Sequence, residues 1–292
     1  MFIFGVIFAL VAGILFGLIG PTTKIAYNFG ASASLAILFR YVVATIFILP
    51  FIPFQKNLLE TYQKNIISFL LISLGSILLT SGLLISFNYI NVSLAVLIFC
   101  LYPIYVLIYS VLVDKEEINI IVKFLFFSTF IGIFLVLGPS LRIDNLIGII
   151  FAVIASIGAT SMIVINQKMS RKGIQPIPIN IFINIINTIF FFLIIKVFFS
   201  LNISYDFNIY LFIFIPSACY CLAFLSQLYA IPRIGQSNTA LFLYLEPVVG
   251  VLGAVYFLDE ILTFSQLVGA VVVILSLLLA TYYTNKTKNV VS

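Results

Sequence analysis

Histidine and tryptophan are absent from the 292-residue chain, and charged residues make up only 8% of it. Without histidine, most zinc sites, haem ligation and the Ser–His and Cys–His nucleophilic schemes are excluded. We therefore expect no metal ion and no cofactor. The three cysteines, Cys100, Cys219 and Cys221, lie inside apolar runs. Disulfides of a secreted framework are not expected there, so the cysteines are interpreted as small packing residues.

Apolar residues dominate the composition. They make up 63% of the chain, and the mean hydropathy is +1.29. An average soluble domain is about 25% charged. A soluble fold of this size could not bury so much apolar surface, so the lipid bilayer must be the solvent of this chain. The composition excludes a cytosolic enzyme, a secreted module and a disordered chain.

Ten apolar runs follow one another along the sequence. A helix needs about 20 apolar residues to cross the hydrocarbon core, and each run is close to that length. The runs span residues 3–23, 31–52, 66–87, 91–112, 120–138, 146–167, 177–199, 209–229, 237–258 and 264–283. They are solidly apolar rather than alternating, which excludes a transmembrane β-barrel. The sequence therefore predicts an all-α integral membrane protein with ten transmembrane helices.

The second half of the sequence repeats the first. A shift of 144 residues places Pro103 over Pro247 and Glu116 over Glu260. Each half contains five predicted helices, and because five is odd, the second half must enter the membrane inverted. Many secondary transporters have such inverted repeats and bind substrate near the midplane between them. The predicted units are residues 1–142, residues 143–284 and a short cytoplasmic tail, 285–292.

The basic residues indicate how the chain lies in the membrane. Ten of the 14 Lys and Arg residues fall on one side, and the other four are Lys24, Arg40, Arg142 and Lys196. The positive-inside rule places the side with the ten basic residues, and both chain termini, in the cytoplasm. The expected location of the protein is the inner membrane of a bacterium. The net charge of +5 is scattered over short loops, so no nucleic-acid partner is expected. A monomer and a homodimer are both left open.

Residues 245–269, LEPVVGVLGAVYFLDEILTFSQLVG, carry the most specific motif. It combines a Pro-Val pair, small residues, a glutamate after an apolar stretch, and Gly269 nine residues later. Pro103 and Glu116 form a weaker counterpart in the first half. The N-terminal part adds Gly13, Gly17, Lys24 and the run FRYVVA at 39–44. On these residues the chain resembles the drug/metabolite transporter superfamily and, within it, the EamA-type ten-helix carriers.

This resemblance covers essentially the whole chain. It implies a metabolite carrier, often an exporter, with a small-molecule substrate and a central cavity formed by helices of both halves. It implies no particular substrate. The first half departs from the motif, because Tyr102 precedes its proline and Leu125 stands nine residues after Glu116. We therefore do not expect the two halves to be functionally equivalent.

Glu246 is the most informative candidate residue, because it is the tenth residue of a 22-residue run and lies near mid-depth. A charge at the bilayer centre costs at least about 2.5–3.5 kcal/mol unless it faces water, a partner or a proton. Pro247 follows it and cannot donate to the carbonyl of Leu243, so a kink is expected there. Two interpretations stay open. Glu246 binds a substrate ammonium group or a coupling proton, or it is a structural carboxylate paired with another helix.

Arg40 is the obvious partner, since it is the tenth residue of its own run and also lies near mid-depth. Its guanidinium group stays charged at any relevant pH, so it needs a carboxylate, backbone carbonyls or water. We interpret Arg40 first as a structural anchor and alternatively as a clamp for a substrate carboxylate. Its counterpart in the second half, Asn184, is polar but neutral.

Glu116 and Glu260 come a few residues before predicted helices whose N-caps are Asn119 and Thr263. Thr263 and Gln266 form a capping-box pattern. A carboxylate near a helix N-terminus complements the helix dipole, so a structural role is favoured for both glutamates. The alternative is a gate ion pair.

Other positions complete the predicted site. Pro103 and Pro247 are predicted hinges, because a proline inside a helix kinks it. Polar side chains assigned to helix interiors are candidates for hydrogen bonds to substrate. These candidates are Asn88, Tyr89, Tyr102, Asn166, Gln227 and Tyr244.

Other classes of protein fit the sequence less well. Intramembrane hydrolysis needs a nucleophile–base pair or two mid-depth aspartates, and all aspartates lie near helix ends, so no enzyme is predicted. A channel would need rings of charge or a carbonyl filter, and the sequence shows neither. A non-transporting receptor or assembly protein is the remaining alternative. The favoured substrate is an amino acid or a related zwitterionic or aromatic compound. Nucleotide-type cargo is second, because the cluster of basic residues that phosphates favour is missing.

Overall fold

The computed structural model describes residues 2–138, 145–198 and 207–291. Within these ranges every regular element is a helix. Ten of the described spans are long and apolar enough to cross a membrane. The predicted all-α membrane protein with ten transmembrane helices is therefore confirmed. The predicted boundary at residue 142 and the side of Arg142 lie outside the described residues.

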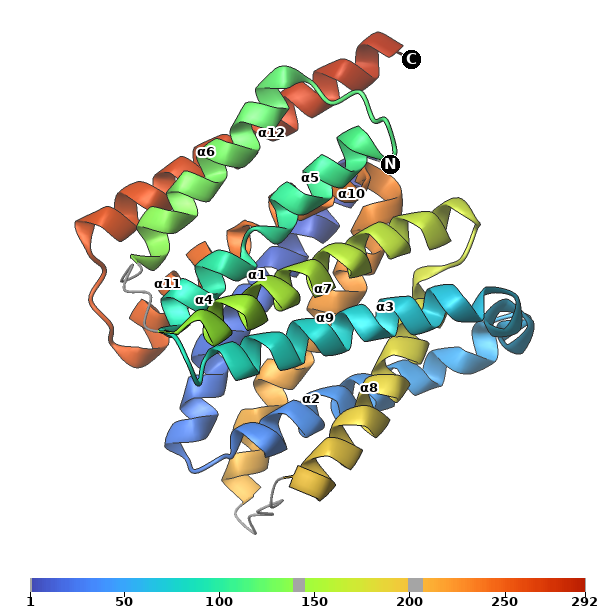
Figure 1. The fold of residues 1–292 in the computed structure, drawn as a ribbon, viewed down its shortest axis with the longest axis vertical. Coiled ribbons are helices and arrows are strands. Elements are labelled where there is room, and N and C mark those ends of the chain that lie inside the picture. Colours follow the sequence, from blue (N-terminus) through green and yellow to red (C-terminus); the bar gives the residue numbers. More distant parts are fainter. Residues whose placement is uncertain (1, 139–144, 199–206, 292) are drawn as a thin grey trace.

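The helices of the first half are α1 (Phe2–Asn28), α2 (Ala33–Ile48) with the 3₁₀ helix η1 (Leu49–Phe54), α3 (Leu58–Ser86), α4 (Val92–Phe99), α5 (Tyr102–Leu112) and α6 (Ile120–Leu137). Those of the second half are α7 (Leu146–Arg171), α8 (Pro176–Phe198), α9 (Phe207–Ile234), α10 (Gln236–Phe242), α11 (Leu245–Leu258) and α12 (Phe264–Val291). Figure 1 shows that the N- and C-termini lie at the same end of this bundle.

Two predicted boundaries need correction, because hydropathy ends a run at the first polar residues whereas a helix continues through them. The third helix begins at Leu58 rather than at residue 66, and its polar first turns carry an ion pair of 2.6 Å between Lys64 and Glu60. The last helix continues to Val291, so most of the predicted tail is helical.

The fourth and ninth transmembrane spans are each broken into two half-helices. The first break separates α4 from α5, with Pro103 in the first turn of α5. The second separates α10 from α11, with Pro247 in the first turn of α11. A proline in the first turn of a helix lacks the N–H that would continue the backbone hydrogen bonds of the preceding half-helix. The chain therefore turns before the proline and then starts a new helix. The predicted kinks are full breaks in the structure.

The packing of the helices shows a pseudo-twofold relation between the halves. The first helix of each half packs on the third helix of the other, as α1 on α9 and as α7 on α3. The second, fourth and fifth helices of each half pack on their own counterparts: α2 on α8, α5 on α10, and α6 on α12. This is the pattern expected when a pseudo-twofold rotation places one inverted repeat on the other. It also brings the two broken spans into contact, because α5 packs on α10.

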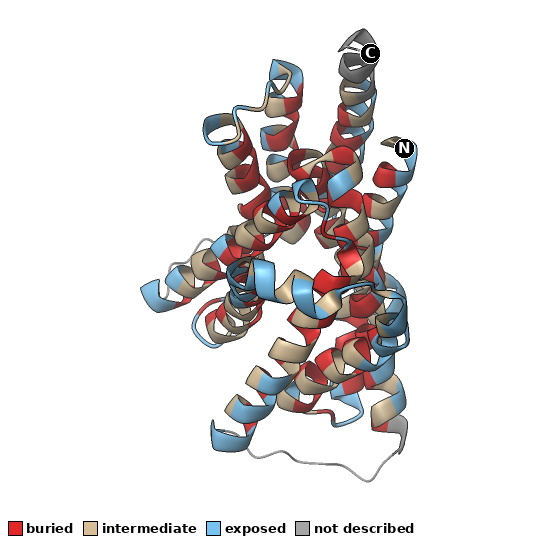
Figure 2. Cartoon of the chain, turned by 90° about the vertical axis from the view of Figure 1, so that its right-hand side faces the viewer, coloured by how far each residue is buried: buried red, intermediate tan, exposed pale blue. Residues whose placement is uncertain are grey.

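Glycines set how closely the halves approach. A Cβ atom on Gly158 would lie 2.6 Å from the carbonyl oxygen of Gly75, and one on Gly269 would lie 2.6 Å from that of Gly132. Helices α1 and α11 also pack closely at Gly17, since a Cβ there would lie 2.6 Å from the backbone oxygen of Glu246. Buried residues face the interior of the bundle, and exposed residues cover its outer surface (Figure 2).

Candidate functional site

A cavity of about 290 Å³ lies between the two halves. Helices α1 to α5 contribute its walls from the first half, and α7, α9 and the α10–α11 break contribute them from the second. Most of the lining side chains are apolar or aromatic. Its polar and charged members are Arg40, Tyr41, Ser76, Thr80, Tyr102, Tyr220, Gln227 and Glu246. Four of these, Arg40, Tyr102, Gln227 and Glu246, are candidates that the sequence indicated.

Glu246 lies in the first turn of α11, directly after the helix break. Its side chain is half-buried on the cavity wall, and it forms no hydrogen bond or ion pair with another described residue. The positive end of a helix dipole stabilises a negative charge at this position. Tyr102 occupies the matching place in the first half and also lines the cavity. The break therefore presents an unpartnered carboxyl group to the cavity.

Arg40 reaches the cavity from α2. Its guanidinium carbon lies 5.6 Å from the ring centroid of Tyr220, in the geometry of a cation–π contact. Among the described residues it forms no ion pair with Glu246. The interpretation of Arg40 and Glu246 as a directly paired structural unit is therefore corrected: both charges face one cavity without contacting each other.

A hydrogen-bonded aromatic wall stands beside Arg40, and the sequence did not single it out. The Tyr41 hydroxyl lies 2.7 Å from Thr80 Oγ1, and the edge of its ring faces Tyr220 with centroids 5.4 Å apart. Ser76 accepts a hydrogen bond of 2.6 Å from Asn187. Tyr41 lies inside the motif FRYVVA, next to Arg40, but in a chain with 16% aromatic residues such a position carries little signal.

The remaining candidates lie elsewhere. Asn166 is buried in α7 and Tyr244 is buried at the α10–α11 break, and neither the Asn166 Nδ2 atom nor the Tyr244 hydroxyl has a partner in the described structure. Asn88 and Tyr89 are exposed in the turn between α3 and α4. Their assignment to a helix interior was wrong, because the third helix ends at Ser86, where the chain turns toward α4.

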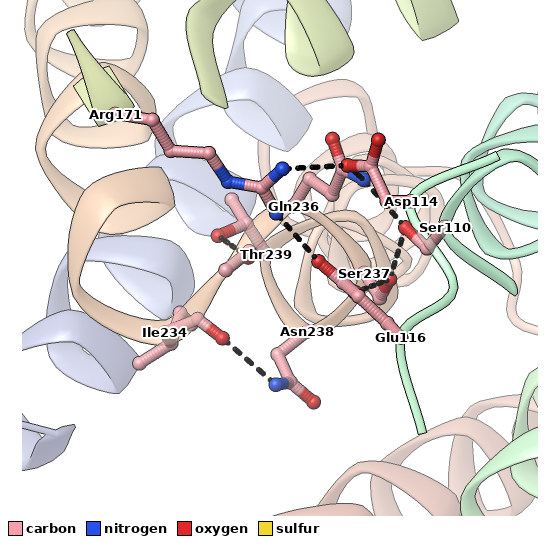
Figure 3. Close-up of polar contacts among 10 residues, drawn as sticks. Ser110, Asp114, Glu116, Arg171, Ile234, Gln236, Ser237, Asn238 and Thr239 are labelled. Atoms are coloured by element: carbon pink, nitrogen blue, oxygen red, sulfur yellow. Dashed lines mark hydrogen bonds and ion pairs between the residues drawn. The ribbon is translucent and has the colours of Figure 1, made fainter. Parts of the chain in front are cut away.

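Polar side chains from both halves are joined by hydrogen bonds at one end of the bundle (Figure 3). Arg171, at the end of α7, donates to Asp114 and Glu116, each over 3.1 Å. Gln236 donates to Asp114 over 3.0 Å, and Ser237 donates to Glu116 over 3.3 Å. We call this group, completed by Ser110, the Arg171 cluster. Glu116 thus forms an ion pair with Arg171, whereas the gating role that was the alternative to a structural role stays a prediction.

The predicted helix caps are confirmed. Asn119 accepts a hydrogen bond of 2.9 Å from the N–H of Ile121. The Thr263 hydroxyl accepts a bond of 3.3 Å from the backbone N–H of Gln266, and the Gln266 side chain accepts one of 2.9 Å from the backbone N–H of Thr263. Glu260 precedes this capping box in an exposed loop and has no ion-pair partner among the described residues. The two glutamates therefore differ, although their sequence positions correspond.

Comparisons with known proteins agree with this architecture. A family model described as the EamA-like transporter family matches residues 3–138 and again residues 146–282. A search of curated proteins found no match. Among solved structures, one described as "Crystal structure of protein" has 13% sequence identity and a TM-score of 0.79. The alignment covers 96% of this chain and 98% of the other, so the two share a fold.

Proposed function

Since the chain belongs to the EamA-like transporter family, whose model matches both of its halves, we propose that it is a secondary transporter of a small zwitterionic metabolite. An amino acid or a similar compound is the substrate class, and the central cavity is its binding site. The protein works by alternating access, in which the cavity opens in turn to the two sides of the membrane.

The observation that carries the proposal is the pair of opposite charges that line one cavity. Arg40 and Glu246 both line the cavity, and they form no ion pair with each other. A charge held inside a membrane needs a partner, and such residues mark substrate pathways. A zwitterion supplies both partners at once. Its carboxylate binds the Arg40 guanidinium group, and its ammonium group binds the Glu246 carboxylate through charge-assisted hydrogen bonds.

The rest of the cavity favours a small substrate with an apolar side chain. Phe16, Phe87, Phe99, Tyr220 and Phe224 are among its walls. A volume of about 290 Å³ is at the lower limit of small-molecule sites. Arg40 is the sole basic residue among the lining residues, whereas a phosphate group favours several. A nucleotide therefore stays the second choice.

The orientation and location are part of the proposal. The charge bias supports cytoplasmic termini and a bacterial inner membrane. The end that carries the Arg171 cluster is then the cytoplasmic end, because both chain termini lie there. Protons are the candidate coupling ion, with Glu246 as the group that carries them. Export is the direction that the family resemblance favours.

A binding experiment with three related compounds tests the proposal. L-phenylalanine has both charges, its methyl ester lacks the carboxylate, and 3-phenylpropionate lacks the ammonium group. We expect only L-phenylalanine to raise the melting temperature of the purified protein at low millimolar concentration. Arg40→Gln and Glu246→Gln should each abolish this shift, whereas Glu117→Gln, at an exposed position outside the cavity, should preserve it. Equal shifts with all three compounds would refute recognition of a zwitterion.

A further inference from the structure

The two ends of the bundle are related by the same pseudo-twofold symmetry that exchanges the halves. In the first half, Glu116 follows the end of α5 and belongs to the Arg171 cluster. A shift of 144 residues leads from Glu116 to Glu260, which follows the end of α11 at the opposite end of the bundle. If the protein alternates between two states, a contact that closes one end has a counterpart that closes the other.

At the opposite end the counterpart contact is not formed. A hollow of about 450 Å³ separates the end of α1 from the loop after α11, and its lining includes Lys24, Asn28, Asp259 and Glu260. Lys24 is the one basic residue in this lining. Neither Lys24 nor Glu260 forms an ion pair with a described residue. One basic and two acidic side chains thus border a gap.

The gap communicates with the candidate substrate site. A further hollow of about 410 Å³ is lined by Glu246 and Pro247 and also by Lys24 and Glu260. It shares Glu246 and four other lining residues with the central cavity: Phe16, Gly20, Val96 and Phe99. A path lined by these residues therefore runs from Glu246 to the end where Lys24 and Glu260 lie. At the other end, the Arg171 cluster joins the two halves by hydrogen bonds and ion pairs.

The environment of Lys24 differs from that of its counterpart. A shift of 144 residues leads from Lys24 to Lys168, whose ammonium nitrogen lies 5.0 Å from the ring centroid of Tyr109. The residue that corresponds to Tyr109 is Gly253, which offers no ring. Lys24 is therefore not held by such a contact, and its long, flexible side chain is able to reach an acidic partner.

We propose that Lys24 and Glu260 form the ion pair that closes this end in the opposite state of the transport cycle, when the Arg171 cluster separates. The inference rests on the proposed carrier function. In carriers with inverted repeats, each repeat can adopt the conformation that the other has in the first state. This exchange generates the state in which the cavity opens to the opposite side of the membrane. The Arg171–Glu116 pair is partly exposed, with side chains that are 48% and 28% exposed. Ion pairs of this kind contribute little net stability, so this contact can form and break in turn with the Lys24–Glu260 pair. Lys24 and Glu260 are positioning residues, since the substrate site lies deeper.

Pulsed electron paramagnetic resonance measures the distance between two spin labels at either end of the bundle, and it needs no substrate. One labelled pair, Lys172→Cys with Glu117→Cys, reports on the Arg171 end. The matched pair, Asn28→Cys with Ile261→Cys, reports on the Lys24 end; its positions are those of the first pair shifted by 144. All four residues are exposed. The labels are introduced into a protein whose native cysteines have been replaced by serine.

Arg171→Gln removes the central cation of the Arg171 cluster. This substitution removes both ion pairs of the cluster. We therefore expect the ratio of short to long distances at the Lys24 end to rise at least about fivefold, because the loss of one partly exposed ion pair already accounts for a change of that size. Asp114→Asn with Glu116→Gln tests the same point if Arg171→Gln folds poorly. Lys64→Gln, which removes a surface ion pair elsewhere, should change neither distance.

The role of the Lys24–Glu260 pair is then tested by the same distance measurements in variants that also carry Arg171→Gln. Adding Glu260→Gln should remove the short distances at the Lys24 end. The charge exchange Lys24→Glu with Glu260→Lys should restore them. Unchanged distances in the Glu260→Gln protein would overturn the inference. Because no substrate is present, loss of amino-acid binding would leave this result intact and would count against the proposed substrate alone.

Discussion

Replacement of Glu246 by glutamine removes one negative charge from the cavity wall and changes little else. The side chain keeps its size and most of its hydrogen-bonding capacity. If the carboxylate binds a substrate ammonium group, the variant loses a hydrogen bond to a charged group, which contributes about 1.5–3 kcal/mol. Each 1.36 kcal/mol corresponds to a tenfold change. Transport should therefore fall about ten- to hundredfold.

The structure also predicts that this variant folds. No described residue pairs with the Glu246 carboxylate, so its neutralisation leaves no buried partner without a counter-charge. The cost to stability is limited to the interaction with the dipole of α11, about 0.3–1 kcal/mol. Protein abundance should hardly change. This separates the functional role from the structural one, in which the half-buried Arg40 would lose its counter-charge at a large cost.

Uptake of labelled L-phenylalanine into proteoliposomes measures transport, and fluorescence-detected size exclusion measures abundance. Glu117→Gln is the matched control, because it removes the same charge at an exposed position. Full transport by a well-expressed Glu246→Gln protein would refute the role of Glu246. Lost abundance that Arg40→Gln restores in the double variant would show that the two residues form a structural pair.

Three further predictions follow from the breaks, the membrane orientation and the glycine contacts. Pro247→Ala should reduce transport more than Pro103→Ala in the uptake assay, because it restores an N–H that can heal the break beside Glu246; equal activity of both variants and the wild type would remove the proposed hinge. In a cysteine-free background, a cysteine at Lys172 should be protected from impermeant thiol reagent outside intact cells and one at Asn145 should react, and the reverse would contradict cytoplasmic termini. Gly158→Ala should lower the melting temperature, since its Cβ would lie 2.6 Å from a facing backbone carbonyl oxygen and overpacking costs about 1–3 kcal/mol; an unchanged melting temperature would refute this.

The sequence predicts the fold well because local chemistry determines most of it. Apolar runs of membrane-spanning length identify the ten helices, and the 144-residue repeat with five helices per half requires inversion. Asn119 and Thr263 cap helices through side-chain bonds to the next few residues, so spacing alone reveals them. Pro103 and Pro247 lack the N–H that a continuous helix needs. Each of these signals lies within a few residues of the structure that it predicts.

The candidate site could be predicted only in part, because it depends on contacts between distant segments. The positions of Arg40 and Glu246 at mid-depth are readable from run length, but whether they touch is not. The Arg171 cluster joins residues 110–116, 171 and 236–237, which come together only when the halves pack. Tyr41 carried no distinguishing signal among many aromatic residues. Asn88 was misplaced because hydropathy does not locate a helix end to within two residues.

Counterflow in proteoliposomes tests most directly whether this chain carries a zwitterionic metabolite through the cavity of Arg40 and Glu246. Liposomes are loaded with unlabelled L-phenylalanine or L-leucine, diluted, and given the labelled compound outside. We expect a transient accumulation of label above equilibrium, which Arg40→Gln and Glu246→Gln abolish and Glu117→Gln preserves. Absence of that accumulation with either amino acid, or its appearance only with a nucleotide such as UMP, would contradict transport of a zwitterion through this cavity.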